Sequence, residues 1–249
     1  MTELGGNFNN DATVIVHDSA EDLASAAVGD FVRRAEEAIG ERGRFVVALA
    51  GGSTPIATYE LLAKDARDSV DWGRVHVFFG DERTVPPDSE DSNFKMANDA
   101  LLSHVSPASV HRMRGELDPA RAAEEYEREL SEFFGGERPV FDLIHLGIGD
   151  DGHTASLFPN TDALDVSDRL AVENRVEKLD TTRLTLTKET INAARAVVFL
   201  VAGEGKAGAL KEILKSDADP HEFPSKLIRP AGGPVWMLDR AAASKLEAG

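Results

Sequence analysis

Short apolar runs alternate along this chain with longer segments in which apolar residues recur at helical spacing. Several runs, such as FVVALA and AVVFLVA, are continuously apolar, as expected of parallel strands that are covered on both faces. The runs predict strands at Thr13–His17, Phe45–Ala50, Val75–Phe79, Phe141–Leu146, Ala171–Asn174, Leu184–Leu186, Ala196–Ala202 and Val235–Leu238.

The longer segments predict amphipathic helices with recognisable starts. Ser19 and Asp22 have capping-box spacing at the beginning of a helix over Ser19–Ile39. Asp118 is a cap, and Pro119 suits the first position of a helix that continues over Ala120–Phe133. Further helices are predicted at Pro55–Ala63 and, after a Ser92 cap, at Asn93–Leu102. Strands that alternate with helices predict an α/β fold with a mostly parallel central sheet flanked by helices.

The 249 residues contain no internal repeat and no low-complexity tract. The stretches richest in Gly, Pro, Asp and Ser are Gly80–Ser92, Gly135–Pro139 and Lys215–Pro234, and none resembles a domain linker. We therefore predict a single domain over residues 1–249, a length that supplies ample material for a core.

The composition excludes several classes of function. Asp and Glu number 44 against 27 Lys and Arg, so the formal net charge is −17, which repels nucleic acid and anionic lipid. Without cysteine there is no disulfide, thiolate nucleophile or Cys-based zinc site. The longest strictly apolar run, Ala196–Ala202, falls far short of the ~20 residues that span a bilayer. With no visible signal peptide, we expect a soluble cytoplasmic protein.

In an open parallel sheet, ligands bind beyond the carboxyl ends of the strands. The first loop in such a place is Ala50–Pro55, with the sequence AGGSTP. Gly51 and Gly52 allow close backbone approach, and Ser53 and Thr54 lie where a helix starts. Free N–H groups and the helix dipole favour an anion there, most naturally a phosphate. The alternative is an ordinary glycine-rich turn with a hydroxyl cap.

The second loop begins at Phe79–Arg83 and contains a tight cluster of charges, Asp81, Glu82 and Arg83. We expect the neighbouring carboxylates to hold Arg83, whose guanidinium could bind an anion or stabilise a developing oxyanion. The alternative is a solvated loop with a local ion pair.

The third loop follows the predicted strand Phe141–Leu146 and matches the dinucleotide pattern G-x-G-x-x-G. Two aspartates would face the pyrophosphate, and Pro159 interrupts the helix that should follow, so we do not predict a dinucleotide site. We predict instead that the glycines present His153 as a general base or acid, with Asp151 to orient it. The alternative is a purely structural histidine.

Two further cations are candidates for the same site. Lys206 follows the strand Ala196–Ala202 near a helix start and could serve a phosphate as a point charge. Arg183 enters the segment RLTLT and, taken alone, has the pattern of a surface arginine. No histidine pair has H-E-x-x-H spacing, and no compact His, Asp and Glu cluster is present, so we expect no metal and no other cofactor.

Taken together and in this order, GGSTP, FGDER with Ser92–Asn93, and GDDGHTASLFP resemble the 6-phosphogluconolactonase family. RLTLT, Gly203–Lys206 and Trp236–Asp239 are similar to that family's later segments, so the resemblance covers nearly the whole chain. It implies a modified Rossmann-like α/β sandwich, shared with hexosamine-6-phosphate deaminases and ribose-5-phosphate isomerases. The chain departs from the family pattern at Asp150, where proline is frequent, which adds a carboxylate beside His153, and at Ile148, where methionine is common.

The resemblance implies metal-independent hydrolysis of 6-phospho-D-glucono-1,5-lactone to 6-phospho-D-gluconate, the second step of the oxidative pentose phosphate pathway. The family's catalytic histidine falls on His153, as base and then acid, Asp151 would orient it, and Arg83 would bind the lactone oxygen or place the substrate. The partner is this small sugar phosphate lactone, and we expect a monomer or a weak homo-oligomer. The phosphate would bind at Gly51, Gly52, Ser53, Thr54, Arg183 and Lys206.

Two alternatives share the fold. An amino-sugar-6-phosphate isomerase or deaminase would resemble this chain but carry a glutamate shortly after the histidine, whereas the next one here is Glu173, and an aromatic residue in place of Arg83. A non-enzymatic sugar-phosphate sensor would need a DNA-binding module, for which a first strand at Thr13 leaves no room.

Overall fold

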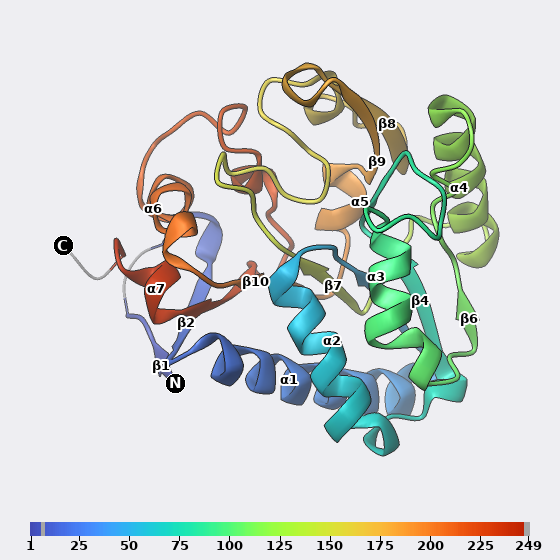
Figure 1. Cartoon of the computed structure of the whole chain (residues 1–249), viewed down its shortest axis with the longest axis horizontal. Helices are drawn as coiled ribbons and strands as arrows, with labels where there is room; N and C mark the ends of the chain where they lie inside the picture. Colours follow the sequence, from blue (N-terminus) through green and yellow to red (C-terminus); the bar gives the residue numbers. More distant parts are fainter. Residues whose placement is uncertain (6–7, 247–249) are drawn as a thin grey trace.

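The computed structural model describes residues 1–5 and 8–246. Its main feature is an eight-stranded sheet (Figure 1). The strands are β1 (Thr2–Glu3), β2 (Thr13–His17), β3 (Phe45–Leu49), β4 (Val75–Phe79), β6 (Ser109–Val110), β7 (Leu143–Leu146), β10 (Val197–Val201) and β11 (Val235–Asp239). Their spatial order is β1-β2-β11-β10-β7-β3-β4-β6, with β1 antiparallel to β2 and the other neighbours parallel. The predicted α/β fold with a mostly parallel sheet is therefore confirmed.

Both faces of this sheet are buried, which explains the continuously apolar strands. In β10, Val198 and Leu200 face one core cluster, whereas Val197, Phe199 and Val201 face the other. The first cluster is covered by α1 (Ala20–Arg42), α2 (Ser53–Asp65) and α3 (Asn93–Ala100). The second is covered by α4 (Pro119–Phe133), α5 (Lys188–Asn192), α6 (Ala207–Lys215) and α7 (Arg240–Ala243).

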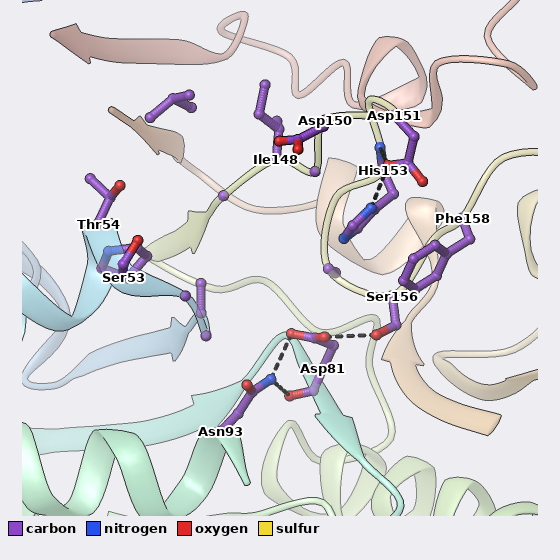
Figure 2. A pocket seen from close by; sticks show the side chains of 18 of the residues that line it. Ser53, Thr54, Asp81, Asn93, Ile148, Asp150, Asp151, His153, Ser156 and Phe158 are labelled. Carbon is purple, nitrogen blue, oxygen red and sulfur yellow. Dashed lines mark hydrogen bonds and ion pairs between the residues drawn. The ribbon is translucent and has the colours of Figure 1, made fainter. Parts of the chain in front are cut away.

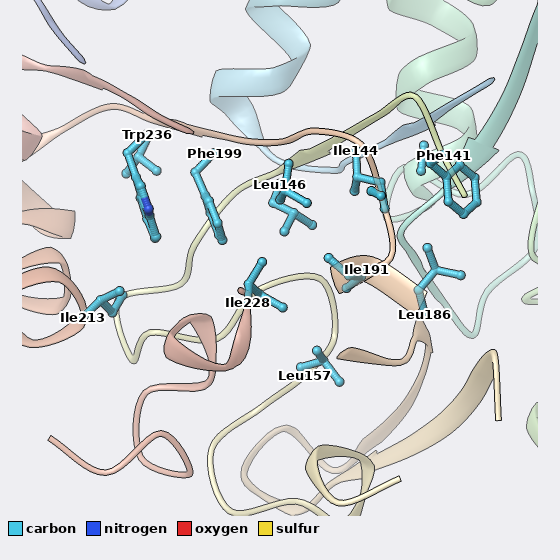
Figure 3. Packing of buried hydrophobic residues seen from close by; sticks show 14 of the residues in the cluster. Phe141, Ile144, Leu146, Leu157, Leu186, Ile191, Phe199, Ile213, Ile228 and Trp236 are labelled. Carbon is cyan, nitrogen blue, oxygen red and sulfur yellow. The ribbon is translucent and has the colours of Figure 1, made fainter. Parts of the chain in front are cut away.

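The second core cluster is the one shown in Figure 3, where side chains from β7, β10 and β11 meet those of the covering segments. The rings of Phe199 and Trp236 stack in parallel across β10 and β11, with centroids 3.8 Å apart. Each fully buried side chain of this size contributes roughly 1.5 to 3 kcal/mol relative to exposure. This packing makes the sheet a rigid base for the loops that follow its strands.

Helix starts agree with the predicted caps. The hydroxyl of Ser19 accepts a hydrogen bond from the backbone N–H of Asp22 at 3.1 Å, and the Asp118 carboxylate accepts one from Arg121 at 3.2 Å. Ser92 caps α3 in the same way through Lys95. Three helices have bounds that differ from the prediction: α1 extends to Arg42, α2 covers Ser53–Asp65, and α3 ends at Ala100, where a short 3₁₀ turn replaces its last residues.

A second sheet is the main feature that the sequence analysis did not predict. Strands β5 (Asp81–Arg83), β9 (Thr181–Leu186) and β8 (Ala171–Val176) form an antiparallel sheet in the order β5-β9-β8. The stretch Gly80–Ser92, predicted as a loop, thus begins with a strand. The predicted strands at 171–174 and 184–186 exist but are longer, because polar residues at the exposed hairpin end conceal their apolar alternation.

Among the described residues, none of the helices combines the length and the apolar character that crossing a membrane requires.

Candidate active site

The carboxyl ends of four neighbouring strands, β10, β7, β3 and β4, open into one cavity of about 530 Å³. The second sheet forms the opposite wall through residues of β5, β9 and the β8–β9 connection. Every residue that the sequence predicts for the site lines this cavity: Gly51, Gly52, Ser53, Thr54, Arg83, Asp151, His153, Arg183 and Lys206. Segments that are far apart in the chain therefore meet as the sequence predicts.

The glycine-rich turn after β3 ends at the beginning of α2. Gly52 is the N-cap residue, with a φ of 101°, a conformation that strongly favours glycine. Because glycine has no side chain to cap the helix, the first N–H groups of α2 remain directed at the cavity, beside the hydroxyls of Ser53 and Thr54. This geometry suits an anion such as a phosphate oxygen.

His153 projects from the loop after β7 into the cavity, and Figure 2 shows it facing the space between the Ser53–Thr54 turn and Asp81. Its Nδ1 lies 2.6 Å from Oδ1 of Asp151, which also accepts the backbone N–H of His153 at 3.2 Å. A carboxylate only accepts hydrogen bonds, so in the neutral ring Nδ1 carries the proton and Nε2 has the lone pair. This is the tautomer that a general base requires at Nε2.

The loop that carries His153 is supported from several sides. Gly149 has no room for a side chain, because a Cβ atom there would lie 2.1 Å from Nδ1 of His153. The His153 ring stacks on Phe158, with centroids 4.1 Å apart. Ser225, within the segment Lys215–Pro234, donates hydrogen bonds to the carbonyl of Gly152 from its hydroxyl at 2.8 Å and its N–H at 3.0 Å. That segment therefore supports the loop that carries His153, a role that its composition did not reveal.

As the sequence analysis expected, no α-helix follows directly after this glycine loop: the described residues past Pro159 continue through turns and the short 3₁₀ helix Asp162–Leu164.

Arg83 and Arg183 face each other across the β5–β9 pair, where they are register partners. Arg83 donates to the carbonyl of Asp91 at 2.7 Å, and Arg183 donates to the hydroxyl of Thr181 at 3.3 Å. Burial, followed by the charge of Arg83, lowers the pKa of Arg183 from its ordinary value. Opposed like charges destabilise a strand pair, so this arrangement indicates a place for an anion.

The expectation that neighbouring carboxylates hold Arg83 is confirmed for its backbone, whose N–H donates to Glu82 at 2.7 Å, and is wrong for its guanidinium, which donates to the carbonyl of Asp91. Glu82 turns away from the cavity and accepts the N–H groups of Asn93 and Phe94 at 2.7 and 2.8 Å, at the start of α3. Its pKa is raised because burial outweighs these hydrogen bonds. Asp81 instead accepts from Ser156 at 2.7 Å and from Asn93 at 3.1 Å. The solvated-loop alternative for this cluster is therefore also wrong, since Asp81 and Glu82 are buried.

Lys206 reaches the cavity from the turn after β10, and its Nζ forms an ion pair with Asp150. The sequence suggested that the Asp150 carboxylate would lie beside His153. In the structure it extends to the other side of the loop, toward Lys206. An anion bound by Lys206 must therefore compete with this carboxylate.

Sequence reasoning missed four cavity residues: Asp81 as a lining group, Asn93, Ser156 and Lys178. The first three form the hydrogen-bonded floor of the cavity (Figure 2). Asp81 and Asn93 belong to the second of the three motifs already identified and Ser156 to the third, so their proximity follows once those motifs are brought together. Lys178 lies in a hairpin connection that carries no signal in the sequence.

The cavity is electrostatically unlike the rest of the molecule. Its lining contains four cationic side chains, those of Arg83, Lys178, Arg183 and Lys206, against the three carboxylates of Asp81, Asp150 and Asp151. The chain as a whole has a formal charge of −17. A local excess of positive charge thus counters the repulsion that an anionic ligand meets at long range. Within the described ranges, no group of three or more His, Cys, Asp or Glu could hold a metal ion.

Comparison with known proteins places the chain among enzymes of sugar phosphates. The family described as "Glucosamine-6-phosphate isomerases/6-phosphogluconolactonase" matches residues 18–237. The 6-phosphogluconolactonase of Synechocystis is 48% identical over 219 residues, covering 86% of this chain and 89% of that protein. The 6-phosphogluconolactonase of Homo sapiens is 36% identical, covering 94% and 93%. The crystal structure of 6-phosphogluconolactonase from Thermotoga maritima has a TM-score of 0.80 at 32% identity, covering 92% and 99%.

Proposed function

We propose that His153 is the catalytic base of this protein, which belongs to the glucosamine-6-phosphate isomerase/6-phosphogluconolactonase family. The enzyme hydrolyses a sugar phosphate lactone. The substrate is 6-phospho-D-glucono-1,5-lactone and the product is 6-phospho-D-gluconate, within the pentose phosphate pathway. The observation that supports the role of His153 best is its contact with Asp151, which places the proton of the neutral ring on Nδ1 and the lone pair on Nε2, inside a cavity rich in cations.

Hydrolysis needs a base for water, a group that stabilises the oxyanion, and an acid for the leaving oxygen. Nε2 of His153 takes a proton from water as the water oxygen bonds to the lactone carbonyl carbon. The carbonyl oxygen becomes an oxyanion, which Arg83 stabilises as a hydrogen-bond donor. When the intermediate collapses, the bond between that carbon and the ring oxygen breaks, and the imidazolium returns its proton to the ring oxygen. Asp151 stabilises the imidazolium in between without taking its proton.

The phosphate lies at the opposite end of the substrate from the reacting ester. We assign it to the N-terminus of α2, where Gly51, Gly52, Ser53 and Thr54 offer backbone and hydroxyl donors. Arg183 and Lys206 supply the positive charge. Fixing the phosphate in this way places the lactone against His153 and converts binding energy into orientation of the ester.

The experiment that tests this function is the hydrolysis of freshly generated 6-phosphogluconolactone, with the spontaneous rate subtracted. A large enzyme-dependent rate, lost in the His153→Ala variant, is the expected result. No acceleration of this substrate would contradict the function. Release of ammonia from glucosamine-6-phosphate in a parallel assay would then assign the site to the isomerase branch of the family.

Replacing Lys206 by alanine should raise KM for the phosphorylated lactone more than KM for free glucono-1,5-lactone. The reason is that Lys206 is expected to contact only the phosphate, where one charge-assisted hydrogen bond contributes about 1.5 to 3 kcal/mol, or roughly 10- to 100-fold in KM. Steady-state kinetics on both substrates measure this difference. Lys211→Ala, which removes the same charge from the exposed side of α6, is the matched control. Equal effects on the two substrates would show that Lys206 does not bind the phosphate.

A further inference from the structure

The connection between β8 and β9 overhangs the cavity, and it carries a lysine that the proposed chemistry does not use. Lys178 lies in the 3₁₀ turn Glu177–Leu179 at the end of this hairpin, and both Lys178 and Leu179 line the cavity. The hairpin end is itself tied by an ion pair between Arg175 and Asp180. A cation is thus presented to the cavity from the wall opposite the parallel strands.

Lys178 ends on the carboxylate that orients the catalytic histidine. Its Nζ pairs with Oδ2 of Asp151, while Oδ1 of the same carboxylate lies 2.6 Å from Nδ1 of His153. Nζ is also 5.8 Å from the centroid of Phe158, the ring on which His153 stacks. Lysine, aspartate and histidine therefore form a chain of contacts, in which each oxygen of Asp151 has its own partner.

From this geometry we propose that Lys178 is a positioning residue for His153, acting through Asp151, and that its charge keeps the histidine available as a base. The inference rests on the proposed function of His153. Lys178 does two things in this scheme. It fixes the carboxylate so that Oδ1 remains on Nδ1, and its positive charge offsets the attraction of the Asp151 carboxylate for a proton on the imidazole.

The ionisation of the Asp151 carboxylate agrees with the proposed role of Lys178. Burial alone would raise the pKa of Asp151, but its hydrogen bonds to His153 and Lys178 hold that pKa well below its ordinary value. The carboxylate is thus always charged at physiological pH. An unbalanced carboxylate in contact with the ring would favour the imidazolium, which cannot act as a base.

The other charged groups that face His153 across the cavity stay the same when Lys178 is changed. They are Asp81 on the floor, Arg83 and Arg183 on the second sheet, and the Asp150–Lys206 pair on the far side of the loop. Lys178 has a side chain that is 55% exposed. Since exposed ion pairs contribute only about 0 to 1 kcal/mol to folding, its replacement should leave the fold intact.

The test is the pH dependence of kcat/KM for lactone hydrolysis in Lys178→Met, Lys178→Arg and wild-type enzyme. We expect the acid limb to move to higher pH by about 0.5 to 1 unit in Lys178→Met, because loss of the cation favours the imidazolium. Lys178→Arg should restore the wild-type limb. Asp151→Asn should move the limb in the opposite direction, to lower pH, and also lower the plateau, since the amide no longer selects the tautomer.

Three outcomes separate the possible roles. A lower plateau in Lys178→Met with an unmoved acid limb would overturn the proposal and leave Lys178 a structural or substrate-binding group. A wild-type profile would overturn it as well. Lys211→Met controls for loss of one positive charge elsewhere. If wild-type enzyme shows no lactonase activity, or if His153→Ala keeps it, the proposed function itself has failed, which is distinguishable from a failure of Lys178 alone.

Discussion

Replacing His153 by alanine is expected to lower kcat for 6-phosphogluconolactone hydrolysis by about 10²- to 10⁴-fold. Among the residues that line the cavity, His153 is the one imidazole, and its 2.6 Å contact with Asp151 holds the ring in position and selects the tautomer whose lone pair is on Nε2. Without it, water must lose its proton to solvent, and the ring oxygen must leave without a positioned acid. The cations proposed to bind the phosphate remain, so KM should change much less than kcat.

Comparison with a second histidine variant makes this result specific. His104 is exposed in the 3₁₀ turn Leu102–His104 that follows α3, and its ring forms a hydrogen bond with the backbone carbonyl of Asp99. His104→Ala should therefore keep wild-type kcat. Thermal unfolding of both variants shows whether the fold is intact, which matters because the His153 ring packs on Phe158. Near-normal turnover in folded His153→Ala would remove the residue from the catalytic role, and the base would have to be sought elsewhere in the cavity.

The sequence predicted the central sheet because its strands are buried on both faces and are continuously apolar, as in β3 and β10. It also predicted that three loops meet, because parallel strands carry their carboxyl ends to one edge. The second sheet escaped prediction for a physical reason. Its strand β5 consists of Asp81, Glu82 and Arg83, and the burial of Asp81 and Glu82 is made possible by partners that are distant in sequence, such as Ser156 and Asn93.

The local sequence pattern likewise did not predict which partners the charged side chains would have. Residues close in sequence, such as Asp150 and His153, point to different sides of their loop. The two successive aspartates take lysines from opposite walls of the cavity, Lys206 and Lys178. Which carboxylate touches the histidine depends on the backbone conformation of a glycine-rich loop, and that conformation is set by tertiary contacts such as those of Ser225.

Stability should fall as pH decreases from about 6.5 toward 4, and His145 should account for a large part of this loss. His145 lies in β7, fully buried, with its Nδ1 3.4 Å from the hydroxyl of Tyr59 and no hydrogen-bond partner for Nε2 among the described residues. Burial lowers the pKa of His145 from its ordinary value to about 4. Below pH 6.5 the unfolded chain binds a proton that the folded chain refuses, so acid favours unfolding.

The size of the effect follows from the same pKa difference. His145 should cost about 2 kcal/mol of unfolding free energy at pH 5 and about 3 kcal/mol below pH 4. Urea unfolding of wild-type protein and His145→Gln at pH 8, 7, 6 and 5 measures this cost. At pH 8 the variant should be less stable than the wild-type protein, because the substitution removes the native packing of His145 against Tyr59. On acidification the variant should lose less stability than the wild-type protein does. His104→Gln, at an exposed position, should keep the wild-type pH dependence.

Parallel stability curves for wild-type protein and His145→Gln would contradict this account and assign the acid sensitivity to other groups, such as His17 and His76, whose pKa values burial also lowers. The distinction bears on catalysis, because β7 leads directly into the loop of His153. Acid can abolish activity in two ways. Protonation of His153 is reversible and leaves the fold intact, whereas protonation of His145 unfolds the strand that holds the loop. The acid side of the kcat/KM pH profile therefore reports on His153 and Lys178 only at pH values where urea unfolding shows that the native state is fully populated.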